Sequence, residues 1–148
     1  MCIKALKKYL PKNAKVLDVG CGSGILSIAS LLYEASSAHG IDIDGTAVKG
    51  AKNNAILNNV TDKFTIEQGD LIENITNKYD IVVANLLTDP IKELLPSLKN
   101  CLVESGIAII SGVIGFRKEE VEKIIHNDFY IVEQTITDNW CCYVLKAK

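Results

Sequence analysis

The sequence predicts an α/β fold: a seven-stranded, mostly parallel sheet with helices on both faces and a C-terminal antiparallel hairpin. Short apolar runs alternate with amphipathic stretches over most of the chain, which is the order of repeated βα units. Three alternating glycines follow the first strand-like run, where a strand turns tightly into a helix. The last two apolar runs are separated only by residues 137–139, and so short a turn joins antiparallel strands.

The first half of the chain predicts three helices and three strands. Pro11 ends the first amphipathic pattern, because proline interrupts a helix. Asp44 is a suitable N-cap for the third helix, and Asn58 and Asn59 end it. In chain order we expect a helix over residues 3–10, a strand over 15–19, a helix over 25–35, a strand over 38–43, a helix over 46–57 and a strand over 64–68.

The second half predicts two further βα units and the hairpin. Asp89 and Pro90 mark a helix start, since aspartate suits the N-cap and proline the first helical position. The run at residues 107–111 is almost entirely apolar, as in a strand covered on both faces. We expect a strand over residues 79–84, a helix from Asp89 to about Val103, a strand over 107–111, a helix over 118–127, and paired strands over 129–136 and 140–145.

The glycine turn predicts a ligand site. Gly20, Gly22 and Gly24 have no Cβ, so a ligand can lie against the main chain there. Asp42 comes 18 residues after Gly24, at the end of the next predicted strand, where its carboxylate can accept hydrogen bonds from ribose hydroxyls. The alternative is that the glycines form only a tight turn.

Two residues distinguish between classes of ligand. Dinucleotide sites prefer G-x-G-x-x-G, but Ile25 occupies the position of the last glycine. Asp18 precedes the first glycine, where a carboxylate repels a pyrophosphate and suits a cationic group. A ligand with a ribose, a positive charge and no pyrophosphate fits this pattern. S-adenosylmethionine has these properties.

Other polar residues follow the predicted strands at the same edge of the sheet. Asp70 is placed to accept a hydrogen bond from the exocyclic amine of adenine, although aspartate is also an ordinary turn residue. Asn85 lies across the expected cleft from the glycine turn, and its amide can both donate and accept. We interpret Asn85 as functional rather than as a strand cap, and Asp89 mainly as a helix cap.

Composition limits the classes of function. The 148 residues predict a single domain with a full core, and a formal charge of −2 favours a small ligand or a protein partner over nucleic acid. Five cysteines without a C-x-x-C motif are typical of buried, reduced thiols. We find no signal peptide and no stretch long enough to span a bilayer, so we expect a soluble cytoplasmic protein. The sequence predicts no oligomeric state.

Metal and hydrolytic chemistry are poorly supported. His39 and His126 have no cysteine or histidine at metal-ligand spacing, so we expect no metal site. Both histidines are interpreted as structural or solvated, and Trp140 as a core residue. No nucleophile elbow or paired-carboxylate motif is present.

With these motifs placed, the chain resembles the class I S-adenosylmethionine-dependent methyltransferases and their Rossmann-like fold. It is most similar to the catalytic domain of the ribosomal protein L-eleven methyltransferase family (PrmA), from about Ile3 to Leu145. The glycine turn is common to the superfamily, whereas the Asn-Leu-Leu of residues 85–87 and the Ser-Gly-Val-Ile of residues 111–114 are more discriminating.

The resemblance implies methylation of amino groups, a lysine ε-amine and an N-terminal α-amine, on a ribosomal protein. A small-molecule methyltransferase and a cofactor-binding unit without activity alone are the alternatives. Methyltransferases of planar nitrogens carry Pro-Pro and an aromatic after the Asn or Asp, whereas this chain has Leu86 and Leu87, which favours an aliphatic amine. By motif match the cofactor-binding residues are Asp18, Gly20, Gly22, Gly24, Asp42, Ile43, Asp70, Leu71 and Asn85, with Asn85 also catalytic.

Members of this family also have an N-terminal substrate-recognition domain and a segment rich in glycine, threonine and histidine before the first helix. Neither precedes Met1 in this sequence. We therefore expect residues 1–148 to correspond to the S-adenosylmethionine-binding domain alone.

Overall fold

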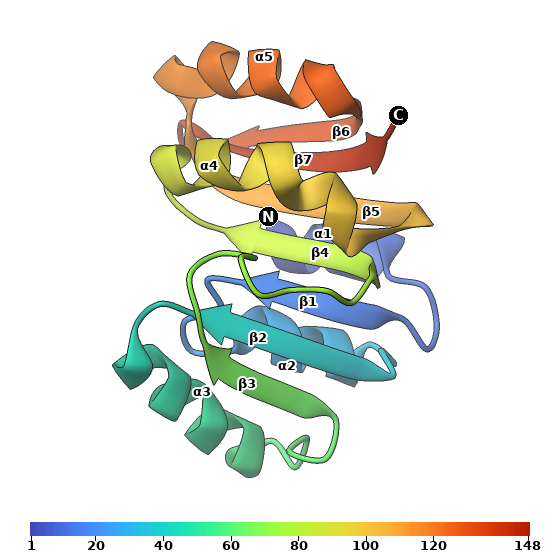
Figure 1. Cartoon of the computed structure of the whole chain (residues 1–148), viewed down its shortest axis with the longest axis vertical. Helices are drawn as coiled ribbons and strands as arrows, with labels where there is room; N and C mark the ends of the chain where they lie inside the picture. Colours follow the sequence, from blue (N-terminus) through green and yellow to red (C-terminus); the bar gives the residue numbers. More distant parts are fainter.

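The computed structural model describes all residues, 1–148, and arranges seven strands in a single sheet (Figure 1). The sheet order is β3-β2-β1-β4-β5-β7-β6, and only β7 runs against its neighbours. The predicted α/β fold is confirmed. The strands are β1 (Lys15–Val19), β2 (Ser37–Asp42), β3 (Phe64–Gln68), β4 (Tyr79–Asn85), β5 (Leu102–Ile114), β6 (Phe129–Thr137) and β7 (Trp140–Ala147).

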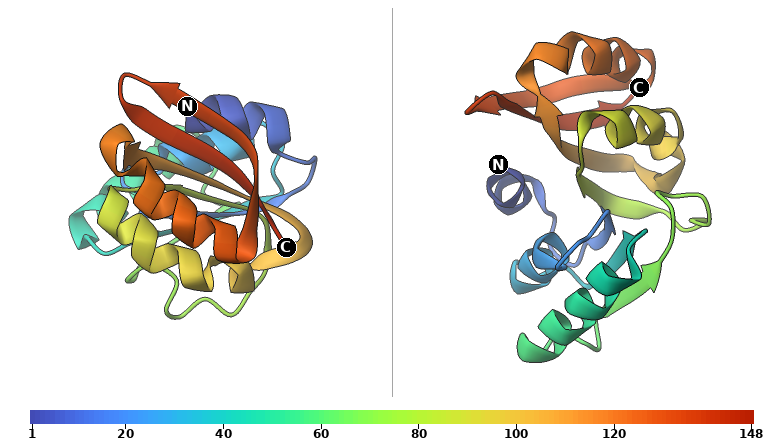
Figure 2. Two further views of the ribbon diagram at one scale, coloured as in Figure 1. Left: turned by 90° about the horizontal axis from the view of Figure 1, so that it is seen from above. Right: turned by 90° about the vertical axis from the view of Figure 1, so that its left-hand side faces the viewer.

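Helices cover both faces of the sheet, as Figures 1 and 2 show. On one face lie α1 (Cys2–Tyr9), α2 (Ile25–Leu32) and α3 (Gly45–Leu57). On the other lie α4 (Thr88–Leu98) and α5 (Lys118–Asp128). Two short 3-10 helices, η1 (Lys99–Cys101) and η2 (Gly115–Arg117), flank β5.

The central strands are buried on both faces because their sequences are apolar at consecutive positions. In β4, Ile81 and Val83 pack with α1 and α2, whereas Val82 and Ala84 pack on the opposite face beneath α4. The connection from β3 to β4 contains no helix, and Ile72 packs it against the α4 face. All five cysteines are free and buried, as predicted.

The order of strands reverses between β1 and β4, which both run in the same direction. Ligands of open α/β sheets bind at the carboxyl ends of strands at such a reversal. The turn after β1 is the glycine turn, Gly20–Gly24, and Asn85 is the last residue of β4, directly before the turn that follows it. The two motifs singled out in the sequence therefore meet at one edge of the sheet.

The predicted boundaries around β5 were wrong. The helix expected to reach Val103 ends at Leu98, η1 follows, and β5 begins at Leu102. Leu102 pairs with Tyr79 before an irregularity in the ladder, so the strand is much longer than the apolar core of residues 107–111. The helix expected over residues 25–35 also ends early, at Leu32.

Two side-chain predictions were also wrong. Asp89 lies in the first turn of α4 rather than at its N-cap, which is Leu87. Trp140 is 39% exposed, because it opens β7 at the rim of the sheet beyond the packed core. No helix in the structure combines the length and apolar character that crossing a bilayer requires.

Candidate functional site

The glycine turn keeps its backbone exposed to a ligand at one position. Gly20, Gly22 and Gly24 have φ values of 69°, 54° and 78°, in the left-handed region that side chains disfavour. A Cβ on Gly20 would collide with the side chain of Leu86, whereas a Cβ on Gly22 would meet no atom within 4 Å. Both its positive φ and its contact with Leu86 therefore favour glycine at position 20, and Gly22 leaves open space beside the main chain.

Asp42 is held against this turn by main-chain hydrogen bonds. Gly22 N–H donates to Asp42 Oδ2 at 2.8 Å, and Asp44 N–H donates to Oδ1 at 2.9 Å. Each carboxylate oxygen retains a free lone pair, because an ionised carboxylate accepts about four hydrogen bonds. Asp42 is thus oriented and half-buried before any ligand binds.

Asp18 is buried beneath the turn, with 1% of its surface exposed. Its Oδ2 accepts hydrogen bonds from Ser27 N–H at 3.0 Å and from Ser27 Oγ at 2.7 Å. Its Oδ1 is buried and has no partner. Burial raises the pKa of this carboxyl to about 6, although the bonds from Ser27 oppose the shift. An uncompensated buried oxygen of this kind favours a cationic or hydrogen-bonding group beside it.

Asn85 ends β4 with its side chain exposed, and the residue after it is tied to β5. Leu86 N–H donates to the carbonyl of Ser111 at 3.0 Å. A Cβ on Gly112 would collide with the carbonyl of Leu86, so the turn after β4 passes directly beside the main chain of β5. The position of Asn85 therefore depends on the end of β5.

Asn85 lines a cavity of about 920 Å³, which we call the acceptor cavity. Its walls come from the starts of α1 and α2, the end of β4 and the turn after it, the C-terminal part of β5 and the tip of the β6–β7 hairpin. The lining residues are Met1, Cys2, Ile3, Lys4, Ile25, Leu26, Asn85, Leu86, Leu87, Ser111, Gly112, Thr137, Asp138 and Trp140. Most are hydrophobic, so the cavity suits an aliphatic chain that carries one polar group.

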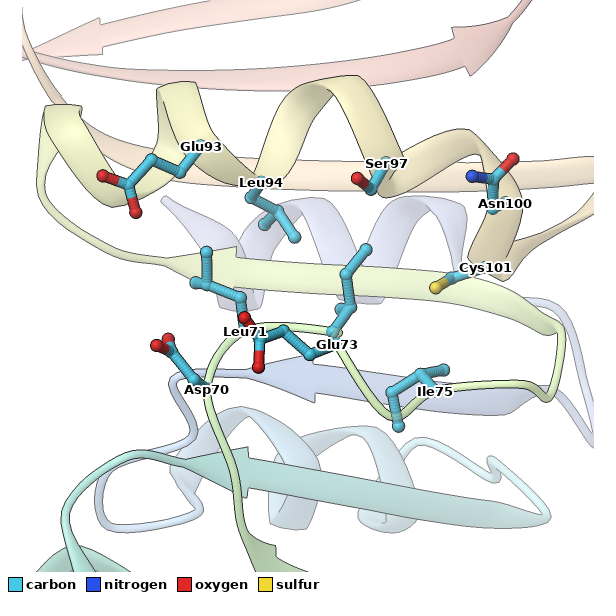
Figure 3. A pocket seen from close by; sticks show the side chains of 10 residues that line it. Asp70, Leu71, Glu73, Ile75, Glu93, Leu94, Ser97, Asn100 and Cys101 are labelled. Atoms are coloured by element: carbon cyan, nitrogen blue, oxygen red, sulfur yellow. The ribbon is translucent and has the colours of Figure 1, made fainter.

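Asp70 and Leu71 lie elsewhere, in a separate groove of about 470 Å³ (Figure 3). This groove runs between α4 and the connection from β3 to β4. Asp70 is exposed at its end, and Leu71 packs in part against the core. Ile43, beside Asp42, is also exposed. The structure thus brings Asp18, Asp42 and the glycines together, and it places Asp70 and Asn85 on different cavities.

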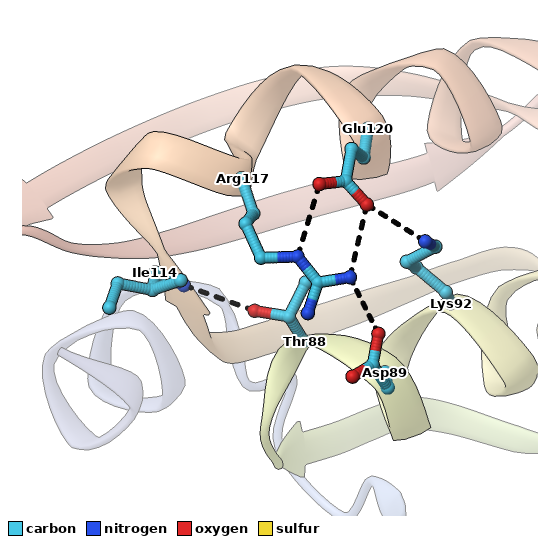
Figure 4. A network of polar contacts seen from close by, with 6 residues as sticks. All are labelled: Thr88, Asp89, Lys92, Ile114, Arg117 and Glu120. Atoms are coloured by element: carbon cyan, nitrogen blue, oxygen red, sulfur yellow. Dashed lines mark hydrogen bonds and ion pairs between the residues drawn. The ribbon is translucent and has the colours of Figure 1, made fainter.

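An ion-pair network joins the elements that follow β4 and β5 (Figure 4). Arg117 Nη2 lies 2.6 Å from Asp89 Oδ1 and 3.0 Å from Glu120 Oε2, and Lys92 Nζ also contacts Glu120. These cations lower the pKa of Glu120 to about 2. Ile114 N–H donates to Thr88 Oγ1 at 3.3 Å beside the network. The polar contacts hold the start of α4 against η2.

Comparison with known proteins identifies the family. A family model described as "Ribosomal protein L11 methyltransferase (PrmA)" matches residues 1–148. The ribosomal protein L11 methyltransferase of Bacillus subtilis (strain 168) is 40% identical over 147 residues, which are 99% of this chain and 47% of that protein. The chain belongs to the ribosomal protein L11 methyltransferase (PrmA) family. It spans about half the length of the curated relatives that it matches.

Solved structures share the fold of this PrmA family chain. A crystal structure of ribosomal protein L11 methylase from Lactobacillus delbrueckii subsp. bulgaricus superposes with a TM-score of 0.96 at 29% identity, covering 99% of this chain and 77% of that one. Methanocaldococcus jannaschii Trm5 in complex with adenosine has a TM-score of 0.86 at 21% identity, covering 99% of this chain and 48% of that one. The second likeness shows the fold alone.

The residues present fit S-adenosylmethionine, the methyl donor of class I methyltransferases. Gly22 leaves room beside the main chain, Asp42 offers oriented acceptors for ribose hydroxyls, and Asp18 has an unpaired buried oxygen. The individual roles of Asp18, Gly20, Gly22, Gly24, Asp42, Ile43, Asp70, Leu71 and Asn85 stay predictions.

Sequence reasoning missed the partner of Asp18 and most of the acceptor cavity. Ser27 follows Asp18 by nine residues and shows no motif, because serine in an apolar helix is common. Lys4, Asp138 and Trp140 reach the cavity only through the packing of α1 and the hairpin against β5. The lysines of residues 4–8 and the short turn at residues 137–139 were visible in the sequence, but their proximity was not.

Proposed function

We propose that this chain is the catalytic unit of an S-adenosylmethionine-dependent N-methyltransferase that modifies amino groups of a ribosomal protein. The observation that carries the proposal is the match of the PrmA family model to residues 1–148, which include the glycine turn and Asn85. The names of the relatives support a ribosomal protein substrate, which would place the activity in the cytoplasm. A folded sample that binds no S-adenosylmethionine would contradict the proposal.

The chain's own residues would bind and orient the cofactor. Gly20, Gly22 and Gly24 accommodate it against the main chain, and Asp42 accepts hydrogen bonds from its ribose. Asp18 faces its positive end, while Asp70, with Leu71 and Ile43, borders its adenine. When bound, S-adenosylmethionine supplies an electrophilic methyl group on a sulfonium.

The acceptor side of the site has to orient the acceptor amine and favour its neutral form. A lysine amine is mostly protonated at neutral pH, and the apolar walls formed by Ile25, Leu86 and Leu87 disfavour the charged form within the cavity. The Asn85 side-chain oxygen can accept a hydrogen bond from the amine and direct its lone pair. Holding the amine in line and excluding water is most of the catalysis that such a transfer requires.

Calorimetric titration and labelled transfer test the proposal together. The chain is titrated with S-adenosylmethionine and then incubated with labelled cofactor and either purified ribosomal protein or cell extract. Label in a ribosomal protein supports the proposal. Label only in small molecules indicates a metabolite methyltransferase, and binding without transfer indicates a cofactor-binding unit that is inactive alone; both outcomes contradict it.

Asn85→Ala tests the catalytic role. We expect turnover to fall by about 100-fold through misplacement of the amine, because small displacements have effects of this size. Cofactor affinity should change little, since the glycine turn and Asp42 are untouched. The measurements are single-turnover transfer rates and calorimetric affinities. An unchanged rate on an accepted substrate would show that Asn85 has no catalytic role.

A further inference from the structure

The acceptor cavity contains one acidic side chain. Asp138 is the only carboxylate among its 14 lining residues, of which 8 are hydrophobic. The other titratable groups that line it all come from the start of α1: the Met1 amine, the Cys2 thiol and the Lys4 amine. A cation that enters the cavity therefore meets one carboxylate, which offsets part of the positive charge of the two amines.

Main-chain contacts fix the turn that carries this carboxylate. Asp138 and Asn139 form the turn between β6 and β7, with φ values of 48° and 66°. Gly115 N–H donates to the carbonyl of Asn139 at 2.7 Å, and Trp140 pairs with Ile114. The hairpin tip is thus attached to the end of β5, on the side of the molecule where α1 begins (Figure 2).

We propose that Asp138 is the specificity-determining residue that selects cationic amines for the acceptor cavity. This inference rests on the proposed function, because it concerns the class of acceptor that the same site takes. Asp138 is exposed, so water screens its charge and the attraction is modest. It opposes the repulsion by the Lys4 and Met1 amines, so its removal should weaken the binding of a lysine ammonium more than that of a neutral group of the same length.

Asp138 does not act as a general base in this scheme. A carboxylate beside an ammonium raises the pKa of the amine, which strengthens binding and opposes deprotonation. The apolar residues of the cavity, such as Ile25 and Leu87, have the opposite effect on the amine. The acceptor is therefore captured as an ammonium and loses its proton to solvent before the neutral amine accepts the methyl group.

A binding experiment tests the proposal without methyl transfer. Trp140 is the only tryptophan and lines the same cavity, so its fluorescence reports occupancy. The probes are Nα-acetyl-lysine amide and the neutral isostere Nα-acetyl-6-hydroxynorleucine amide. We expect Asp138→Asn to lower the affinity of the lysine probe relative to that of the hydroxyl probe by about twofold to fivefold, the range of exposed ion pairs. Asparagine also tolerates positive φ, so the turn is preserved.

Two further variants give matched comparisons. Asp62→Asn removes an exposed carboxylate just before β3, away from the cavity, and should keep the full preference. Lys4→Gln removes the opposing charge from the lining and should increase the preference. An equal preference in the wild type and Asp138→Asn, or an equal loss in Asp62→Asn, would overturn the proposal.

Kinetics on the active protein provide the second readout. Asp138→Asn should raise KM for a lysine-containing substrate by about twofold to fivefold and shift the rise of kcat to lower pH. A raised KM without this shift would overturn the assignment. Because the fluorescence experiment needs no turnover, a retained lysine preference in a protein that transfers no methyl group would contradict the proposed function and leave Asp138 supported.

Discussion

The glycine turn and the acceptor cavity lie at the same edge of the sheet, but they are built from different lengths of chain. The glycine turn, with Asp42, uses two segments from consecutive βα units and is held by main-chain hydrogen bonds to one carboxylate. The acceptor cavity combines α1, the start of α2, the turn after β4, the C-terminal part of β5 and the C-terminal hairpin. Side-chain ion pairs of Arg117 brace its β4 and β5 portion.

The two regions should therefore differ in how well they tolerate substitutions. A backbone site tolerates few changes at its glycines, because all three have positive φ values and a Cβ on Gly20 or Gly24 would meet a neighbouring side chain. A cavity formed by distant side chains tolerates more, because each residue supplies a small part of the wall. Substitutions in the glycine turn should therefore have larger effects than substitutions in the network that supports the cavity.

Gly20→Ala should have the largest effect on stability. The new Cβ meets the Leu86 side chain, and the residue is forced to keep a φ of 69°. Left-handed strain and overpacking together predict a loss of about 3 kcal/mol in the free energy of unfolding. Urea denaturation measures this loss.

Gly22→Ala is the matched comparison, because its Cβ meets open space. Strain alone predicts a loss of about 1–2 kcal/mol in the free energy of unfolding. The larger effect should be a lower affinity for S-adenosylmethionine. If Gly20→Ala were no more destabilising than Gly22→Ala, packing against Leu86 would not be the reason for the first glycine.

Asp18→Asn should remove a pH dependence from the free energy of unfolding. The pKa of Asp18 is about 6 in the folded chain and about 3.9 when unfolded. The protonated carboxyl therefore contributes about 3 kcal/mol to the free energy of unfolding. This contribution is full below pH 4 and is lost as the pH rises through 6. The difference in unfolding free energy between wild type and variant, measured from pH 4 to 7, should follow this sign. A flat difference would show that the carboxyl titrates normally.

Asp42→Asn should weaken cofactor binding more than folding. The amide retains one oxygen for Gly22 or Asp44 but loses the charge that strengthens hydrogen bonds to ribose hydroxyls. We expect calorimetric affinity for S-adenosylmethionine to fall by about 10-fold to 100-fold. Asp44→Asn keeps the cap on Thr46 and is the control. Equal losses in both variants would contradict a ribose contact by Asp42.

Arg117→Gln should have the smallest effect. Its partners Asp89 and Glu120 are exposed, and exposed ion pairs contribute little to folding. We expect a slightly lower melting temperature in dilute buffer and no difference from wild type in about 1 M salt, where charges are screened within a few ångströms. A difference that persists at high salt would show that the arginine acts through packing.

The sequence predicted the backbone site better than the cavity. Gly20, Gly22, Gly24 and Asp42 were visible because glycine spacing and strand order are local signals, and their juxtaposition is confirmed. The end of α4 was missed because the pairing of Leu102 with Tyr79 decides it. Asp89 was misassigned because a cap and a partner of Arg117 look alike in sequence. Tertiary packing, which no local pattern encodes, decided each of these cases.

Leu86 belongs to both regions. Its side chain fills the space above Gly20, and its main chain passes directly beside Gly112. A smaller residue at position 86 would relieve the contact with an alanine at position 20 but not the strain of its φ of 69°, so the cost of one substitution depends on the other. The wall of the acceptor cavity and the glycine motif are thus coupled through this leucine, so a substitution at position 86 also changes the space available beside the cofactor turn.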